Sequence, residues 1–365
     1  MRRGTAFVTL LLLAALAPRE AAAGPALVIE LSNNKVLYAE DADSPWYPAS
    51  LTKIMTAYLV FEALKAGKLD LNTRIPCSAA ANAQPPSKIG VAVGNELTVN
   101  VALNALIIKS ANDAAVMLAE AVAGSEAAFV AQMNATAKRL GMERTVFVNP
   151  NGLPAPNQVT TARDLAKLAR AVLKDFPEYE YLWAKPEMRL GKSRMVTHNG
   201  LLRSFEGADG MKTGFTCDSG FNVVATASRD GRRIIAVVLG DHSSGERNVR
   251  AASLLEYGFQ QHGWKQLFSS TTLDNMPLAT AAAVKSVRND VTSWGCNERK
   301  VRAAKAGAKK RTAKASKKKK PGTEEAAKAA PITVEVAPEG GDGTPATVQL
   351  RGTTPPPAAA SFQQQ

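Results

Sequence analysis

Histidine, which serves many hydrolases as a general base, is scarce in this sequence of 365 residues. The chain holds three histidines, His198, His242 and His262, and they stand far apart from one another. The Gly-x-Ser-x-Gly turn that carries the nucleophile of one large class of serine hydrolases is also missing. A Ser-His-Asp hydrolase is therefore disfavoured, and each histidine is interpreted as an ordinary surface or core residue.

Cysteine is equally rare, and motifs for metals or nucleotides are missing. There is no His-Glu-x-x-His, no Cys-x-x-Cys and no glycine-rich loop that could cradle a phosphate, so we predict neither a metal nor an organic cofactor. The three cysteines, Cys77, Cys217 and Cys296, permit at most one internal disulfide. Cys217 is interpreted as a buried or redox-neutral thiol.

Long hydrophobic runs are missing too. The apolar run from Ala6 to Ala17 falls short of the roughly 20 residues that cross a bilayer, and no later stretch could span one. Basic residues precede this run and Ala21–Ala23 offers a cleavage site, so residues 1–23 are interpreted as a secretory signal peptide. An uncleaved membrane anchor is the alternative. We expect an exported protein of the periplasm or cell envelope, where it could be peripheral to the membrane.

Against these absences stand three short motifs in order along the chain. The first, Ser50-Leu-Thr-Lys53, opens an apolar stretch that runs to Leu64 and is followed by Gly67, a pattern typical of a helix. Residues three apart share a helical face, so the Lys53 amine can take the proton of the Ser50 hydroxyl. The alternative is a capping serine followed by a surface lysine.

The second motif, Ser110-Ala-Asn112, lies between two apolar stretches that end at Ile108 and Val122. This pattern predicts two helices that meet at a buried loop, from which the Ser110 hydroxyl and the Asn112 amide could face a cleft. Ser110 could pass a proton to a leaving amine and Asn112 could hold a substrate amide. The alternative is that either side chain caps the second helix.

The third motif, Lys212-Thr-Gly214, precedes a predicted hairpin, Phe221–Ser228 and Arg233–Leu239, with an Asp230-Gly231 turn. Lys212 and Thr213 would therefore stand on or beside a sheet edge, along which an extended peptide could lie with its terminal carboxylate at both residues. Gly214 indicates a close approach of another backbone. The alternative is a solvated turn.

This ordered set resembles the D-alanyl-D-alanine carboxypeptidases among the low-molecular-mass penicillin-binding proteins, in the superfamily of DD-peptidases and β-lactamases. Four blocks carry the resemblance: Pro48–Thr56, Ser110–Ala115, Asn149–Leu153 and Asp209–Thr216. The resemblance implies a nucleophilic Ser50, a general base Lys53 and a proton relay Ser110. It also implies that Asn112, Lys212, Thr213, Gly214 and Arg247 bind substrate, and that the Ser50 and Phe215 N–H groups form the oxyanion hole. Arg250 is a second candidate for the role of Arg247.

Two consequences concern the chemistry. Lys53 must be neutral to act, and burial together with a second ammonium on Lys212 would lower its pKa. The related class A β-lactamases deacylate with a glutamate, whereas the loop Asn149–Pro156 carries no carboxylate and has Asn151 where relatives commonly have histidine. Efficient β-lactamase action is therefore disfavoured, and β-lactams are expected to act as covalent inhibitors.

The predicted organisation is a signal peptide at 1–23, a catalytic domain at 24–265, a partly ordered linker at 266–297 and a disordered tail at 298–365. The expected fold is α/β (α+β): early and late strands share one antiparallel sheet, helices flank it, and a helical subdomain forms the other wall of the cleft. Many members of the family it resembles carry a compact β-rich domain and an amphipathic membrane helix after the catalytic domain, and we expect neither in this sequence.

Positive charge gathers beyond the predicted catalytic domain. Residues 24–265 hold 26 Lys and Arg against 23 Asp and Glu, whereas residues 266–320 hold 14 against 3. In an exported protein, anionic envelope polymers or lipid head groups are better partners for such a tail than nucleic acid. A solvated linker without a partner is the alternative.

The leading hypothesis is a serine carboxypeptidase that removes the terminal D-alanine from peptidoglycan stem peptides. A DD-endopeptidase that cuts peptidoglycan cross-links is the nearest rival within the enzymes. A catalytically silent envelope-binding protein is the rival from another class.

Overall fold

The computed structural model describes residues 24–261, 270–280, 282–291 and 296. The signal peptide predicted at 1–23 and the tail predicted at 298–365 lie outside the described residues. The linker predicted at 266–297 falls partly within them. These boundaries therefore stay predictions.

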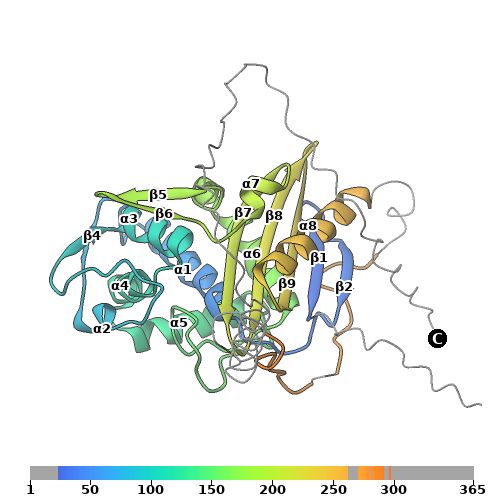
Figure 1. The fold of residues 1–365 in the computed structure, drawn as a ribbon, viewed down its shortest axis with the longest axis horizontal. Coiled ribbons are helices and arrows are strands. Elements are labelled where there is room, and N and C mark those ends of the chain that lie inside the picture. The colour runs from blue at the N-terminus through green and yellow to red at the C-terminus, as the bar shows by residue number, and fades with distance from the viewer. Residues whose placement is uncertain (1–23, 262–269, 281, 292–295, 297–365) are drawn as a thin grey trace, which may run out of the picture.

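A five-stranded antiparallel sheet forms the centre of the structure, with strands in the order β2-β1-β9-β8-β7 (Figure 1). Its strands are β1 (Ala26–Glu30), β2 (Val36–Glu40), β7 (Ala208–Thr216), β8 (Gly220–Arg229) and β9 (Arg232–Asp241). Because β1 lies between β2 and β9, the early and late parts of the described chain share one sheet, as expected. The strand that carries Lys212-Thr-Gly214 stands at the edge, which confirms the predicted placement.

The sheet is covered on both faces, which explains why β1 is buried along its whole length. Alternate residues of a strand point to opposite faces. Ala26 and Val28 pack with the closing helix α8 (Ser244–Gln260), whereas Leu27 and Ile29 join the larger core with α6 (Ala162–Asp175) and α1 (Lys53–Lys65). In Figure 1, α8 crosses the face of the sheet toward the viewer.

The helical part lies beside the β7 edge (Figure 1). It contains the helices α2 (Ala79–Asn82), α3 (Val99–Asn104), α4 (Asn112–Ala123) and α5 (Glu126–Arg139), with the π turn η2 (Ala105–Lys109) after α3. The pairs β3 (Arg74–Pro76) with β4 (Glu96–Thr98) and β5 (Glu187–Leu190) with β6 (Ser193–Val196) form two small sheets. Two further short elements are η3 (Pro177–Leu182) and α7 (Leu201–Ser204).

One predicted helix start differs from the structure, and the start of a second helix fixes the position of Arg247. Ser50 lies in a separate 3-10 turn, η1 (Ala49–Thr52), and α1 begins at Lys53. The closing helix α8 begins at Ser244, ahead of Arg247. The Ser243 hydroxyl accepts from the Glu246 N–H and donates to the Glu246 carboxylate, a reciprocal cap that starts the helix early and places Arg247 inside it.

Cys217 also differs from its prediction, since it forms a disulfide with Cys296. Their Cα atoms are 5.3 Å apart, within the normal range for a disulfide, although 79 positions separate the two residues in the sequence. Such a long separation leaves no local signal in the sequence. Cys77 is the cysteine that remains a buried free thiol.

In the part of the chain that the structure describes, no single helix is long and apolar enough to cross a bilayer. The pair α4 and α5 reaches the required length and composition only together, with a bend of 83° between its members.

Candidate active site

Ser50 and Lys53 meet at the junction of η1 and α1. The Lys53 side chain is fully buried, and its Nζ lies 3.1 Å from Ser50 Oγ. Two further oxygens surround Nζ: Asn112 Oδ1 at 2.8 Å and the Asn151 carbonyl. The Asn112 amide is oriented by its Nδ2, which donates to the Pro85 carbonyl at 2.9 Å, so an oxygen does face the lysine.

This arrangement suits a neutral amine. A neutral amine has two N–H donors and one lone pair, and the two carbonyl oxygens of Asn112 and Asn151 can only accept. The lone pair is then left for the hydroxyl of Ser50. The geometry therefore presents Lys53 as a base aimed at the serine proton.

Burial supports the same protonation state. Burial lowers the pKa of Lys53 well below its usual range, and the charge on Lys212 lowers it further, against an opposing contribution from Asp113. The predicted influence of the second lysine on the first is thus confirmed. Lys212 is itself buried, and its pKa falls to about 7 through burial and through the charge of Arg247.

Ser110 bridges the two sides of the site. It ends η2 with φ 60°, a left-handed conformation that is strained for a residue other than glycine. Its Oγ accepts a hydrogen bond from Lys212 Nζ at 3.0 Å. The first residue before α4, which would cap it, is Ala111 and makes no side-chain bond. The alternative that Ser110 or Asn112 caps this helix is therefore wrong.

Two glycines press against the turn that carries Ser50. At Gly152, φ is +82° and a Cβ would lie 1.8 Å from the Ala49 carbonyl oxygen. At Gly214, a Cβ would lie 3.0 Å from both the Pro48 oxygen and the Ser50 nitrogen. The close backbone approach predicted from Gly214 is thus confirmed, and the approaching backbone is the nucleophile's own turn.

The side of the cleft formed by β7 and its neighbours carries two buried cations. We call it the sheet wall, and the opposite side, formed by η1, α1, the loop at Ser110 and the loop at Asn151, the helical wall. Arg247 is 3 % exposed and donates to the His198 carbonyl and to Asn248 Oδ1. Lys212 donates to Ser110 and to the Thr213 carbonyl. Among the described residues neither cation forms a salt bridge, so both are available to an anion in the cleft.

Arg250, the second candidate for a carboxylate-binding arginine, lies elsewhere. Its guanidinium donates to the Gly24 carbonyl at 2.6 Å and to Glu40 at 2.9 Å, on the far side of β9 from the cleft. Arg247 instead lines the cleft, and burial lowers its pKa to about 10. The structure thus distinguishes the two candidate arginines, because Arg247 lines the cleft and Arg250 does not.

All nine predicted site residues belong to one region. Hydrogen bonds link Lys53 to Ser50 and Asn112, and Lys212 to Ser110. The cleft has a volume of about 520 Å³. Its walls also include Thr213, Gly214, Phe215 and Arg247.

Two parts of the site were not predicted. The carbonyl of Asn151 accepts from Lys53, and His198 lines the cleft although it was interpreted as an ordinary residue. Burial and the charge on Lys212 lower the pKa of His198 to about 4, so its imidazole is neutral near pH 7. No motif marks His198, because its position depends on how the chain between β6 and α7 crosses the cleft.

Comparison with known proteins places this site in a family. A family model described as D-alanyl-D-alanine carboxypeptidase, peptidase S11, matches residues 13–243. The chain belongs to this family. The predicted resemblance and fold class are confirmed, and the family is one of serine hydrolases.

Individual relatives agree with the family. The D-alanyl-D-alanine carboxypeptidase DacC of Escherichia coli strain K12 is 38% identical over 270 residues, which make up 70% of this chain and 68% of DacC. The crystal structure of the carboxypeptidase DacD from Francisella tularensis has a TM-score of 0.63 at 33% identity and covers 66% of this chain and 71% of that one. The cefotaxime-bound penicillin-binding protein D2 of Listeria monocytogenes has a TM-score of 0.60 at 34% identity. The match covers 65% of this chain and 97% of that one. The chain spans about two thirds of the length of the curated relatives it matches.

Proposed function

We propose that this chain removes the terminal D-alanine from peptidoglycan stem peptides through an acyl-enzyme on Ser50. The observation that carries the proposal is the buried Lys53 amine, held by two carbonyl oxygens with its lone pair toward the Ser50 hydroxyl. A serine needs such a base to become a nucleophile near neutral pH. Across the cleft, Lys212 and Arg247 are buried and form no salt bridge within the described part of the chain, so they suit the free carboxylate that ends the substrate.

The reaction follows from these positions. Lys53 accepts the Ser50 proton as Oγ attacks the carbonyl between the two D-alanine residues. The N–H groups of Ser50 and Phe215 donate to the developing oxyanion. The C–N bond then breaks, and the leaving amine takes a proton that Ser110 or Lys53 delivers. Water finally attacks the ester, Ser50 regains its proton and the shortened peptide leaves.

The bound substrate would lie along β7. The outer edge of this strand faces the cleft, so an extended peptide can pair with its backbone. Lys212, Thr213 and Arg247 would receive the terminal carboxylate, and the Asn112 amide would contact the peptide through Nδ2 once substrate displaces its bond to Pro85. A strained β-lactam would acylate Ser50 in the same way and leave slowly, because the loop at Asn151 offers no deacylating carboxylate.

The test compares the wild-type enzyme with Ser50→Ala. We expect the wild type to release D-alanine from a D-Ala-D-Ala peptide and to become covalently labelled by fluorescent penicillin, and Ser50→Ala to do neither. Labelling that persists in Ser50→Ala would contradict the proposal. Mass spectrometry of digested muropeptides separates the carboxypeptidase from the endopeptidase, and a wild type that binds cell wall without labelling would indicate the silent binding protein.

The cellular location of the protein and the partners of its basic tail are proposals that rest on the sequence. The basic segment that follows Cys296 suits anionic envelope polymers or lipid head groups, in a salt-sensitive attraction. Fractionation of cells at low and high salt would test it, since release of the protein from the envelope by salt is the expected result and salt-independent location would contradict it.

A further inference from the structure

The end of β7 bounds the cleft, and the turn after it is held locally by hydrogen bonds between Thr216 and Ser219 and from the Trp46 indole to the Ser219 carbonyl. Phe215, Thr216 and Cys217 all line the cleft, and β7 pairs with a single strand of the sheet, β8. After Thr216 the chain turns back at Asp218 to enter β8 at Gly220. Whatever fixes this turn therefore fixes the part of the sheet wall that would carry the oxyanion N–H of Phe215.

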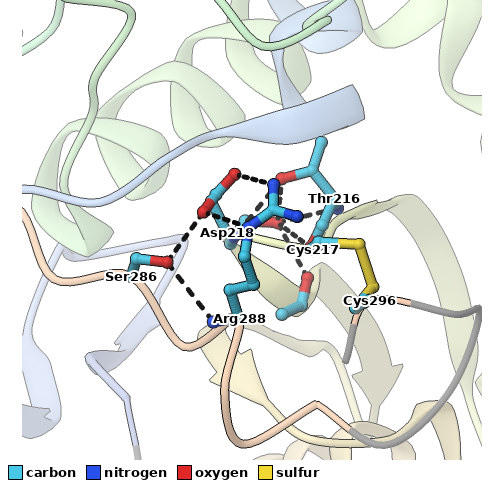
Figure 2. Close-up of a disulfide and its surroundings, with 8 residues drawn as sticks. Thr216, Cys217, Asp218, Ser286, Arg288 and Cys296 are labelled. Atoms are coloured by element: carbon cyan, nitrogen blue, oxygen red, sulfur yellow. Dashed lines mark hydrogen bonds and ion pairs between the residues drawn. A yellow bond between two sulfur atoms is a disulfide. The ribbon is translucent and has the colours of Figure 1, made fainter. Parts of the chain in front are cut away.

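A segment from far along the chain contacts this turn. We call residues 282–291 together with Cys296 the strap. Figure 2 shows the disulfide from Cys296 to Cys217 and, beside it, the Arg288 guanidinium and the Ser286 hydroxyl on the Asp218 carboxylate. Arg288 donates from Nε at 3.0 Å and from Nη2 at 2.6 Å, and Ser286 Oγ donates at 2.8 Å.

The backbone of the strap adds to these contacts. The Val287 N–H donates to the Asp218 carbonyl at 3.1 Å. A Cβ placed on Gly220, where β8 begins, would lie 2.9 Å from Val287 Cγ2, so the side chain also packs against the start of β8. Val291 is fully buried. The strap therefore holds the turn through a covalent bond, a two-point ion pair, a backbone hydrogen bond and packing.

The chain just before the strap is fixed to Arg163 of α6 and to Asp43. Arg163 of α6 forms a buried ion pair with Asp43 and donates to the carbonyls of Met276 and Pro277. The Ala279 N–H donates to the same Asp43 carboxylate at 3.0 Å. This buried ion pair, with its further hydrogen bonds to the chain at 276–279, gives the strap a fixed origin on α6.

From this arrangement we propose that the strap is a positioning device for the substrate-binding strand. It holds the end of β7 at the spacing from Ser50 that acylation requires, and the Cys217–Cys296 disulfide locks it there. The inference rests on the proposed function, since it assigns the strap to the reaction at Ser50. A disulfide that only stabilises the folded domain is the competing interpretation, and it predicts different kinetics.

The main test removes the disulfide in the full chain by Cys217→Ser with Cys296→Ser. We expect KM for a D-Ala-D-Ala peptide to rise and the second-order rate of penicillin acylation to fall, each about three- to tenfold, because small displacements of positioned groups are costly. Labelling should still reach one penicillin per chain, which shows that the Ser50–Lys53 pair is intact. Cys77→Ser, which removes a buried sulfur away from the strap, is the matched control and should leave both constants unchanged.

A second variant keeps the disulfide. Arg288 is half exposed, so Arg288→Ala leaves the core undisturbed while removing the two-point bond to Asp218. For Arg288→Ala we expect a smaller rise in KM and a smaller fall in the acylation rate, and Arg288→Lys should partly restore both. Adding Arg288→Ala to the disulfide-free variant should change either constant little further. Effects that share one route combine less than additively.

A measurement without catalysis completes the test. Hydrogen exchange followed by mass spectrometry should show faster exchange in the peptide spanning residues 211–219 of the disulfide-free variant, with exchange around Ser50 unchanged. A lower melting temperature with unchanged KM, acylation rate and exchange in 211–219 would overturn the strap proposal. If the wild type neither labels nor releases D-alanine, the proposed function fails instead, so the two failures are distinguishable.

Discussion

The two walls of the cleft are held together in different ways. In the helical wall, the functional groups bond to one another: Lys53 contacts Ser50, Asn112 and the Asn151 carbonyl in one buried network. In the sheet wall, Arg247 bonds to the carbonyl of His198 and to its neighbour Asn248, and Lys212 bonds across the cleft to Ser110. The helical wall is thus arranged for proton transfer before substrate arrives, whereas the sheet wall keeps its charges available.

This difference predicts which wall controls substrate binding and which controls the chemical step. A change in the helical wall removes a group that acts on the bond being broken, so it should lower kcat and acylation. A change at a sheet-wall cation, Lys212 or Arg247, removes a group that holds the substrate carboxylate, so it should raise KM. The variants below test that division, from the largest expected effect to the smallest.

The largest effect is expected from Lys53→Met. Methionine fills similar space but cannot accept the Ser50 proton, and loss of a general base typically lowers a rate by about 10²–10⁴-fold. We expect penicillin acylation to fall by about 10³-fold, measured as the time course of fluorescent labelling. Lys65→Met, the same substitution at the exposed end of α1, is the control and should acylate at the wild-type rate. Equal rates in the two variants would mean that Lys53 is not the base.

A smaller effect is expected from Arg247→Gln. A hydrogen bond to a charged group contributes about 1.5–3 kcal/mol, so KM for the peptide should rise about 10- to 100-fold while kcat changes little. Arg250→Gln, one helical turn further along α8, provides the comparison, because its ion pair with Glu40 lies outside the cleft. We expect Arg250→Gln to lower the melting temperature and to leave KM unchanged. A rise in KM for Arg250→Gln alone would reverse the assignment.

The sequence predicted the structural setting of the three motifs well because each motif is local. Ser50 and Lys53 are brought together by one turn of chain, and a sheet edge for Lys212 follows from the strong hairpin after it. The order of the motifs then indicated a family resemblance, and the resemblance implied the role of each site residue. Contacts between residues that lie within a few positions of one another in a motif could be predicted without knowledge of the fold.

The parts that escaped prediction depend on distant segments. Nothing near His198 indicates a cleft, because the loop after β6 reaches it only in the folded chain. The choice between Arg247 and Arg250 required the cap that begins α8 at Ser244. The Cys217–Cys296 disulfide joins residues 79 positions apart, and three cysteines allow more than one pairing. Long-range contacts of this kind leave no periodic signal in the sequence.

The smallest effect concerns the free-energy cost of burying the charged amine of Lys212 in the sheet wall. The pKa of Lys212 is about 7 in the folded protein and 10.5 for an unperturbed lysine, so between these values the unfolded chain binds a proton that the folded chain has released. The free energy of unfolding then rises with pH in this window, by up to about 1.4 kcal/mol per pH unit for one proton. Below pH 7 both states are protonated, and the full penalty for burying the charge is present.

Lys212→Met removes this contribution, and Lys53 contributes to the pH dependence of both proteins. From pH 7 to pH 9 we therefore expect the wild type to gain stability relative to Lys212→Met, by about 1 kcal/mol per pH unit in urea unfolding. Parallel curves for wild type and Lys212→Met would mean that Lys212 stays charged up to pH 9, so that its charge is balanced within the cleft rather than held available for the substrate. In that case the contrast between the two walls would rest on Arg247 alone.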